Sequence, residues 1–344
     1  YDSIYEYVKT FEKDMTVLLC KKKANCRLVN SIPKEVTILD EANLTFLPKS
    51  IKNPVEVENE RIAHIKDGVA LTKFICWLKK NVGKITMTEL SAGEKLYSFR
   101  AQQENFIDNS FDPIISYGIH AAINHYSATP ETDIAIEPGN FLLADTGGHY
   151  YEGTTDTTRT IVMGSVNDEQ KKYFTAVLRG MLNLGNAKFR YGCTGVNLDY
   201  LARGPLWEMG QDFNHGTGHG VGYLLNVHEG PNSFRWRIIQ GDNAVLEEGM
   251  ITSDEPGYYV ENQYGIRHEN LLVCKKAEKT TFGQFMCFEH LTMVPFDLDA
   301  VVPELMTVQE RALLNNYHAQ VYKKISPYLE EEEKEWLKEA TREI

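Results

Sequence analysis

Two aspartates in this sequence stand where they could do chemistry inside a folded chain. An apolar run beginning at Phe141 leads into Asp145, and the segment 153–160 carries Asp156 eleven positions later. With the two-residue period of a strand, Phe141, Leu143 and Asp145 share one face, so a carboxylate points the same way as core side chains. A buried acid needs a partner. Taken alone, an Asp before Gly-Gly more often caps a turn, by about three to one.

Three histidines lie within fourteen positions further along the chain. His215 and His219 belong to a glycine-rich stretch, 214–222, and His228 follows it. Glycines allow the backbone to approach a ligand closely. The stretch does not fit G-x-G-x-x-G, because Val221 stands where the last glycine would be, so a dinucleotide loop is a poor explanation. A tight turn carrying surface histidines explains the stretch about equally well when it is considered alone.

Two glutamates complete the set of candidate groups. Glu255 lies in 253–257, and Glu269 shares a strand face with Leu271 and Val273, so it too projects toward an apolar interior. Burying two Asp and two Glu together makes sense chiefly around cations. The alternative is a structural salt-bridge network with Arg159 and Arg267, to which we give roughly one chance in five.

Four carboxylates and an imidazole form a hard, oxygen-rich ligand set. Such a set favours Mn²⁺ over a thiolate-bound structural zinc, although Zn²⁺ or Co²⁺ also fit. Two bridged ions are the simplest solution, because a pair about 3.5 to 4 Å apart holds a shared water and lowers its pKa toward roughly 7. The sequence contains neither H-E-x-x-H nor G-x-S-x-G, the marks of other hydrolases.

The elements that must position these groups can be read from the apolar pattern. Asn53, Pro54 and Glu56 predict the start of a long helix whose apolar residues recur at three- and four-residue spacing. That stripe consists of Ile62, Ile65, Val69, Leu71, Phe74, Ile75 and Leu78. From about 110 to 275 the apolar runs are short, alternate and are separated by glycines, which indicates antiparallel strands. Helical patterns near 169–189 and 308–337 flank them, so the predicted class is α+β with helices outside a sheet.

Composition excludes several classes of protein. The 344 residues include 42% hydrophobic and 24% charged residues, and the net charge of −12 argues against nucleic acid as the partner. The six cysteines are scattered without a C-x-x-C pair, which favours a reducing compartment and a cytoplasmic location. No apolar run approaches the roughly 20 residues that span a bilayer, so no membrane association is expected. Because the numbering opens at Tyr1, we expect a fragment of a longer protein.

These segments, in this order, resemble the pita-bread metallopeptidases, and among them the cytosolic type of Xaa-Pro aminopeptidase. The resemblance runs from about Asn53 to the C-terminus. It rests on Asn124-His125-Tyr126, Asp145 and Asp156, 153–160, 215–222, 227–231, 254–258 and 265–270.

The resemblance implies the roles of individual residues. Its metal ligands would be Asp145, Asp156, His219, Glu255 and Glu269, with Asp156 and Glu269 bridging or bidentate. They would hold two divalent ions, Mn²⁺ before Zn²⁺ or Co²⁺. His125, His215 and His228 would act in catalysis and, together with Arg267, bind the substrate, while Glu255 would shuttle the proton of a bridging hydroxide. The substrate would be a peptide with proline at its second position, whose tertiary amide lacks an N–H.

The resemblance also implies an organisation into domains. Residues 1–52 would be the C-terminal remnant of a preceding α/β domain. Residues 53–344 would be the catalytic domain, including a C-terminal extension from about 285. Longer members of this type form homodimers, so the full-length protein is expected to be a homodimer, and the shortened chain is expected to be less active.

Three rival functions remain open from the sequence. A prolidase would share the fold and the metals but cleave only dipeptides. A methionine aminopeptidase would share the ligand logic but is usually shorter. A non-catalytic pita-bread binding module would have lost ligands, whereas this chain keeps all five.

Overall fold

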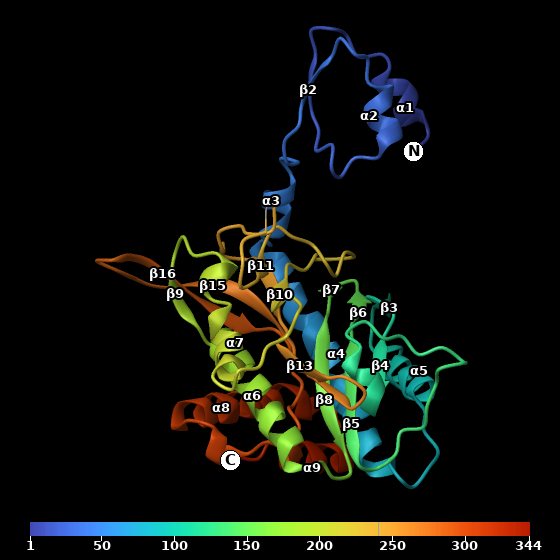
Figure 1. Cartoon of the computed structure of the whole chain (residues 1–344), viewed down its shortest axis with the longest axis vertical. Helices are drawn as coiled ribbons and strands as arrows, with labels where there is room; N and C mark the ends of the chain where they lie inside the picture. Colours follow the sequence, from blue (N-terminus) through green and yellow to red (C-terminus); the bar gives the residue numbers. More distant parts are fainter. Residues whose placement is uncertain (240) are drawn as a thin grey trace. The chain divides into compact units, whose positions relative to one another are not determined.

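The structure of the protein is a computed structural model that describes residues 1–239 and 241–344 (Figure 1). The chain forms two compact units, residues 1–49 and residues 50–344. Within the described part of the chain, every helix is too short or too polar to cross a membrane.

The first unit contains short helices and a pair of parallel strands. β1 (Thr16–Leu18) pairs in parallel with β2 (Thr37–Leu39), and α2 (Cys26–Ser31) lies between them in the sequence, as a parallel connection requires. Helix α1 (Ser3–Val8) precedes these strands and α3 (Phe46–Ser50) follows them. The buried apolar residues of this unit are few, Val8, Ile32 and Val36.

The long helix predicted after Asn53 is α4 (Pro54–Asn81). The Asn53 side chain accepts from the backbone N–H groups of Val55 and Glu56, and the Glu56 carboxylate accepts from the Asn53 N–H, which forms a capping box. Most of the predicted stripe is buried, but Ile62 is 40% exposed and lies outside it. The three- and four-residue spacing therefore identified the helix and most of its buried face.

Three antiparallel sheets of the second unit lie in the part of the sequence that contains Asp145, Asp156 and His219. One has the order β4-β5-β8, one has the order β3-β6-β7, and one pairs β10 with β11. Leu142, Ala144 and Ile161 of the first sheet belong to one buried cluster with Leu71 and Phe74 of α4. The bounds of these strands are β3 Phe106–Asn109, β4 Ile114–Tyr117, β5 Asn140–Thr146, β6 Gly148–Tyr150, β7 Gly153–Thr154, β8 Thr157–Met163, β10 Gly218–His219 and β11 Ser233–Phe234.

Two further antiparallel sheets carry the glutamates. One has the order β12-β15-β16-β9 and the other is the hairpin β13-β14. Helix α6 (Asp168–Gly185) packs against β12, β13, β14 and β16. Helix α8 (Val308–Ile325) packs against α6 (Figure 1). The bounds are β9 Lys188–Arg190, β12 Ile251–Asp254, β13 Gly257–Val260, β14 Tyr264–Arg267, β15 Asn270–Thr280 and β16 Gly283–His290. Antiparallel strands with helices packed outside them give the predicted α+β class.

The helices around the sheets depart from the sequence-based bounds at two places. The helix expected over 169–189 is α6 (Asp168–Gly185), and Phe189 instead belongs to β9, where it pairs with Met286. The single helical pattern over 308–337 is two helices, α8 (Val308–Ile325) and α9 (Glu331–Ala340). Pro327 stands between them and cannot donate a backbone hydrogen bond. Two further α-helices are α5 (Glu89–Arg100) and α7 (Tyr200–Trp207).

Candidate metal centre

The two aspartates come from the sheet β4-β5-β8. Asp145 lies near the end of β5 and pairs with Thr158 of β8, while Asp156 lies in the turn directly before β8. Leu142 and Ala144 face the α4 side, so the alternation along β5 turns Asp145 to the opposite face, as predicted. The strand ladder thus delivers both carboxylates to one end of the sheet.

The two glutamates come from the neighbouring strands β12 and β15. These strands pair with Asp254 opposite Asn270. Glu255 follows Asp254 and Glu269 precedes Asn270, so the two acids lie at the same end of this ladder. The Glu269 N–H donates to the Thr158 carbonyl at 3.0 Å, which ties this end of the ladder to β8. Carboxylates from distant parts of the sequence therefore meet where the sheets adjoin.

His219 enters the same space from β10 with one ring nitrogen already engaged. Its Nδ1 is 2.9 Å from the carbonyl of Gly220, a contact that requires Nδ1 to carry the proton. Nε2 is then directed away from the backbone and lies 3.5 Å from Asp156 Oδ2 and 3.5 Å from Glu255 Oε1. A neutral imidazole with a fixed tautomer and one free lone pair is the form that ligates a metal ion.

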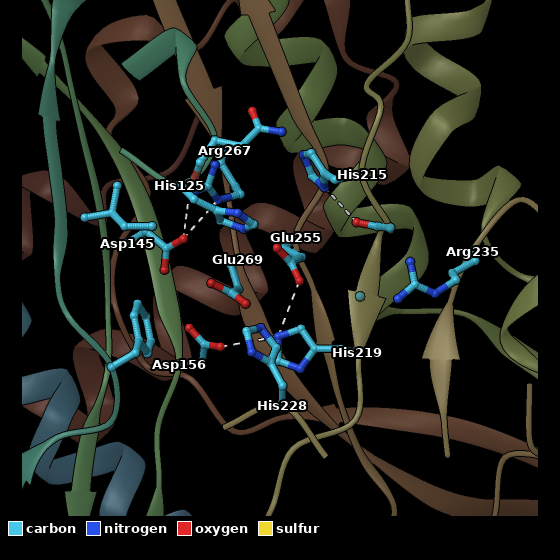
Figure 2. A pocket seen from close by; sticks show the side chains of 15 residues that line it. His125, Asp145, Asp156, His215, His219, His228, Arg235, Glu255, Arg267 and Glu269 are labelled. Carbon is cyan, nitrogen blue, oxygen red and sulfur yellow. Dashed lines mark hydrogen bonds and ion pairs between the residues drawn. The ribbon is translucent and has the colours of Figure 1, made fainter. Parts of the chain in front are cut away.

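Three of the five predicted ligands converge closely. Asp156, His219 and Glu269 offer ligand atoms that all lie within 4.8 Å of one another (Figure 2). Glu255 approaches His219, whereas Asp145 turns to Arg267, whose Nη2 and Nε donate to Asp145 Oδ2 at 2.5 and 3.2 Å. All five residues line one pocket.

Three of these acids, Asp156, Glu255 and Glu269, lie where their negative charge is poorly compensated by the protein. Burial, together with Asp145 and Glu255, raises the pKa of Asp156 well above its ordinary value. Burial and the neighbouring Asp156 do the same to the pKa of Glu269. Burial also raises the pKa of Glu255. The guanidinium of Arg267 forms an ion pair with Asp145, and no arginine in the described part of the chain is paired with the other three carboxylates. Ionising all four acids therefore leaves an excess of negative charge that divalent cations would balance.

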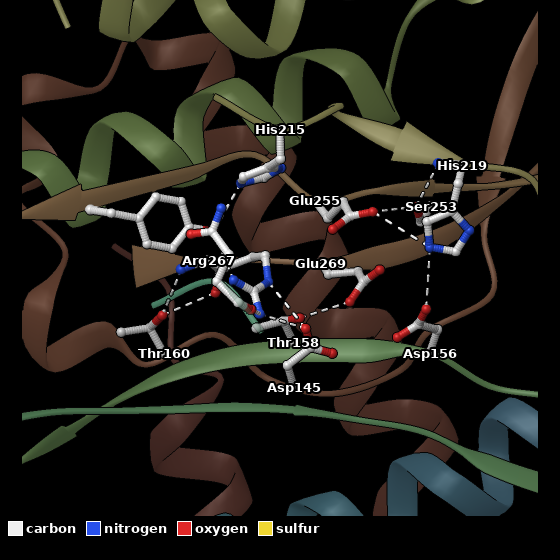
Figure 3. A network of polar contacts seen from close by, with 12 residues as sticks. Asp145, Asp156, Thr158, Thr160, His215, His219, Ser253, Glu255, Arg267 and Glu269 are labelled. Carbon is white, nitrogen blue, oxygen red and sulfur yellow. Dashed lines mark hydrogen bonds and ion pairs between the residues drawn. The ribbon is translucent and has the colours of Figure 1, made fainter. Parts of the chain in front are cut away.

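Hydrogen bonds from neighbouring side chains orient these groups. Thr158 Oγ1 donates to Glu269 Oε2 at 2.7 Å. Ser253 Oγ accepts from the His219 N–H at 2.9 Å and donates to Glu255 Oε1 at 3.0 Å. Figure 3 shows these contacts around the converging carboxylates. Metal ligands held by such second partners are typical of a preorganised site.

The three other predicted histidines lie around the same pocket. The His228 ring packs edge-on against that of His219 with centroids 4.1 Å apart, and burial together with His219 lowers the pKa of His228 to about 4. Burial and Arg267 lower the pKa of His215 to about 3. His125 lies in the pocket wall on an exposed segment. At neutral pH, His215 and His228 are therefore uncharged.

His215 belongs to a chain of contacts that the sequence did not reveal. Its Nδ1 lies 2.7 Å from the Gly216 carbonyl and its Nε2 lies 2.9 Å from the Tyr259 hydroxyl. The proton therefore sits on Nδ1, and the hydroxyl donates to Nε2. Arg267 Nη1 donates to the same hydroxyl at 2.7 Å, so Tyr259 links His215 to Arg267 and onward to Asp145.

Three residues that line the pocket, and one that lies beside it, were missed from the sequence. Phe111, Ile114 and Arg235 line the pocket, and Tyr259 joins the network around it. For Tyr259 a signal existed, since a hairpin pairing Gly257 with Arg267 places Tyr259 and Arg267 on one face. Phe111 and Ile114 gave no local signal, because their place in the pocket depends on contacts with distant segments.

A structural salt-bridge network and a surface turn, the alternatives to a metal site, account for only part of the geometry. Asp145 forms a buried ion pair with Arg267, as the salt-bridge alternative predicts. Arg159 instead donates to carbonyl oxygens, Asn270 and Tyr317. Asp156, Glu255 and Glu269 thus converge without a guanidinium of their own among the described residues, and His219 is a pocket residue rather than a surface one.

Comparison with known families agrees with this geometry. Residues 58–276 match metallopeptidase family M24, and residues 284–344 match the C-terminal region of peptidase M24. A protein of Paracoccidioides brasiliensis strain Pb03 named "Probable Xaa-Pro aminopeptidase P" is 43% identical over 303 residues, which are 86% of this chain and 49% of that protein. Aminopeptidase P1 of Arabidopsis thaliana is 38% identical over 341 residues, 92% of this chain and 53% of that protein. The chain thus spans about half the length of these curated relatives.

Solved structures show the same similarity. The X-prolyl aminopeptidase of Caenorhabditis elegans, described as a cytosolic enzyme with a di-nuclear active site, superposes with a TM-score of 0.92 and 34% identity. The match covers 100% of this chain and 57% of that one. Prolidase from Pyrococcus furiosus superposes with a TM-score of 0.65 and 26% identity over 85% of this chain and 79% of that one. The chain belongs to metallopeptidase family M24 and has the pita-bread fold of that family.

Proposed function

We propose that this chain is the catalytic part of a metal-dependent aminopeptidase that hydrolyses the bond between an N-terminal residue and proline. One observation carries the proposal: Asp156, His219 and Glu269 offer ligand atoms within 4.8 Å of one another, in a pocket that Asp145 and Glu255 also line. The relatives named for Xaa-Pro or X-prolyl aminopeptidase activity support the choice of reaction.

The ligand set defines the cofactor that we propose. Asp145, Asp156, His219, Glu255 and Glu269 would hold two divalent ions, and four carboxylates among five ligands favour Mn²⁺ over Zn²⁺ or Co²⁺. Ions in this position supply Lewis acidity, which lowers the pKa of water and stabilises the negative charge of a hydrolytic transition state. The described ion pair of Asp145 with Arg267 leaves Asp145 Oδ1 outside that pair, so this carboxylate can serve both partners.

The protein side chains supply proton transfer and orientation. Glu255, whose pKa burial raises, would take a proton at its carboxyl oxygens and pass it to the proline nitrogen that leaves. His125 and His228 border the pocket and would contact the substrate there. His215 has both ring nitrogens engaged, so it would act through Tyr259, keeping that hydroxyl beside Arg267.

The proline preference would come from the pocket wall. A pyrrolidine ring is apolar and its amide lacks an N–H, so the site needs apolar surface and no acceptor for that hydrogen. Phe111 and Ile114 supply apolar surface to the pocket. These two side chains are our candidates for the contact with the ring.

The remaining proposals concern the whole protein. We propose that residues 1–52 are the end of a preceding domain and that residues 53–344 are the catalytic domain, with its extension from about 285. The full-length protein is proposed to form a homodimer. All six cysteines are free, and the Caenorhabditis elegans relative is described as cytosolic, so we propose a cytoplasmic location.

Hydrolysis of defined peptides tests the function. The protein, freed of metal by a chelator and reloaded with Mn²⁺, is expected to cleave X-Pro-X tripeptides and to leave X-Ala-X tripeptides intact. If only Zn²⁺ or Co²⁺ restored activity to the metal-free protein, that ion would replace Mn²⁺ as the proposed cofactor. Absence of metal-dependent cleavage in a full-length protein that binds Mn²⁺ would contradict the proposed reaction.

Prolidase is the second candidate, because the pocket is lined by a positively charged side chain that the carboxylate of a dipeptide could contact. Arg235 lines the pocket, with its Nε 2.5 Å from Asp242 Oδ2. Preference for X-Pro dipeptides over X-Pro-X tripeptides would favour a prolidase. A binding module without catalysis would bind no Mn²⁺ and would be unaffected by Asp156→Ala.

A further inference from the structure

Helix α4 carries two buried acids on the side that faces the metal-ligand loops. Glu60 and Asp67 are seven residues apart, two helical turns, so they lie on the same side of the helix. They are 0% and 2% exposed. The helix contacts β7 and β8, which flank Asp156 (Figure 1). Burying an acidic side chain costs free energy unless the side chain is hydrogen-bonded or paired, so each of these acids needs a partner.

Glu60 reaches the turn that carries Asp156. Its Oε1 accepts from the Thr154 N–H at 3.2 Å, two residues before Asp156. Thr154 and Thr155 are fully buried, so this hydrogen bond is shielded from water. It fixes the backbone of the turn rather than any side chain of the pocket.

The contact between Glu60 and this turn depends on a glycine. A Cβ on Gly153 would lie 2.4 to 2.6 Å from the Glu60 carboxyl carbon and oxygens. Gly153 also has a φ of +156°, which L side chains rarely adopt. The carboxylate therefore packs directly against the backbone of the turn, where a side chain would push it away.

Asp67 is linked through Arg100 to Thr146, the residue that follows Asp145. Arg100 Nε donates to Asp67 Oδ1 at 2.7 Å, and Arg100 Nη2 donates to Thr146 Oγ1 at 3.0 Å. Thr146 directly follows Asp145 in β5. The Tyr150 hydroxyl also donates to Asp67 Oδ1 at 3.0 Å. Asp67 and Arg100 are 2% and 1% exposed, so this arm is as buried as that of Glu60.

We propose that α4 is a brace that sets the spacing of the two aspartates, with Glu60 as the positioning residue for Asp156 and the Asp67–Arg100 pair as the positioning residues for Asp145. Neither acid contacts the pocket, so each acts through the backbone or side chain beside a ligand. The link to metal affinity rests on the proposed function, whereas the bracing of the turn does not.

Amide hydrogen exchange and Mn²⁺ titration of the whole protein test the Glu60 arm. Glu60→Met removes the acceptor at similar size, so exchange of the Thr154 amide is expected to rise at least about 10-fold, and Mn²⁺ is expected to bind about 10- to 100-fold more weakly. Glu60→Gln keeps an acceptor oxygen, so both quantities are expected to stay within about 3-fold of the wild type. Rescue by the amide separates positioning from mere packing.

Two further variants isolate the effect. Thr72→Val alters another buried polar residue of α4 at constant size and is expected to change neither quantity. Arg100→Lys keeps a charge beside Asp67 but cannot also reach Thr146, so it is expected to weaken Mn²⁺ binding while Thr154 exchange stays at the wild-type rate. If Glu60→Met does not fold, Glu60→Asp, which withdraws the carboxylate by one methylene, is measured in its place.

The outcomes are distinct. Unchanged Thr154 exchange in Glu60→Met, or equal damage in Glu60→Met and Glu60→Gln, overturns the brace. A wild-type protein that binds no Mn²⁺ overturns the proposed function, but the exchange comparison still decides whether Glu60 holds the turn.

Discussion

Asp156 is a buried carboxylate whose charge depends on its surroundings. It is 4% exposed and lies 3.5 Å from His219 Nε2, and in the part of the chain that the structure describes it forms no ion pair with an arginine, in contrast to Asp145. Asp145 is ion-paired with Arg267 through its Oδ2. The two aspartates, which look equivalent in the sequence, therefore differ in how much a cation would stabilise them.

Removing the charge of Asp156 is expected to abolish metal binding. Asp156→Asn keeps the size of the side chain but loses its charge, so the loss of Mn²⁺ affinity should exceed the roughly 10- to 100-fold typical of an outer partner. Isothermal titration measures this, and X-Pro-X hydrolysis should fall with it. Asp168→Asn, at the exposed start of α6, is the matched control and should leave both unchanged. Full Mn²⁺ affinity in Asp156→Asn would remove this residue from the ligand set.

Tyr259 provides a second test among the individual residues. Tyr259→Phe removes the hydroxyl between His215 and Arg267 and leaves His215 Nε2 without its donor, a loss of about 1 to 3 kcal/mol or roughly 5- to 150-fold. We expect that fall in kcat with a smaller change in KM. Mn²⁺ affinity should stay within about 3-fold, because Arg267 still holds Asp145. Tyr258→Phe, the neighbouring residue on the other face of β13, is the control, and an equal fall in that variant would refute a specific role.

The strands place these residues through close backbone packing. β10, which carries His219, lies beside β12, and a Cβ on Gly218 would lie 1.8 Å from the Ser253 carbonyl oxygen. The position next to the imidazole ligand therefore accepts only glycine. Close backbone approach, rather than a turn, is the reason for this glycine.

Substitution of Gly218 should therefore move a whole strand. Gly218→Ala is expected to lower the free energy of unfolding by about 1 to 3 kcal/mol through overpacking, and to weaken Mn²⁺ binding because His219 shifts with β10. Urea unfolding and Mn²⁺ titration measure the two effects. Gly204→Ala in α7 is the control, since its nearest atom would be at an ordinary 3.5 Å. Unchanged Mn²⁺ binding in a folded Gly218→Ala protein would contradict this account.

The second unit as a whole holds several buried or half-buried histidines away from the pocket. Burial lowers the pKa of His64 and of His290 to about 4, and that of His318 to about 3. His64 lies in α4, His290 in β16 and His318 in α8, so the effect is spread over the structure. Each histidine binds its proton more weakly in the folded chain than in the unfolded chain, whose ordinary pKa is 6.5.

The sign of the resulting pH dependence follows from these values. Because the folded-state pKa is lowered, each histidine contributes its full stability above about pH 6.5, and this is lost as the pH falls toward about 4. Each contributes a slope of up to about 1.4 kcal/mol per pH unit. His318→Gln should therefore lose less stability than the wild type between pH 6.5 and 4.5 in urea unfolding with a chelator present. Parallel pH profiles of the two proteins would show that His318 is not held neutral by burial.

The sequence by itself determined the residue types of the site, the start of α4 and the face of β5 on which Asp145 lies. These depend on local rules, namely capping, helical spacing and the two-residue alternation of a strand. The end of α6 was not determined in this way, because Phe189 pairs with Met286 of β16 and therefore lies in a strand, although the local pattern is helical.

Only the tertiary structure decided which carboxylate takes Arg267, that Tyr259 joins His215 to it, and that Phe111 and Ile114 reach the pocket. Asp145 and Arg267 are 122 positions apart, so no local pattern relates them. Their contact depends on the register of several strands and on the packing of sheets against helices. Such long-range contacts form only when the whole unit folds, which is why residue types predict a metal site while the arrangement of its partners comes from the fold.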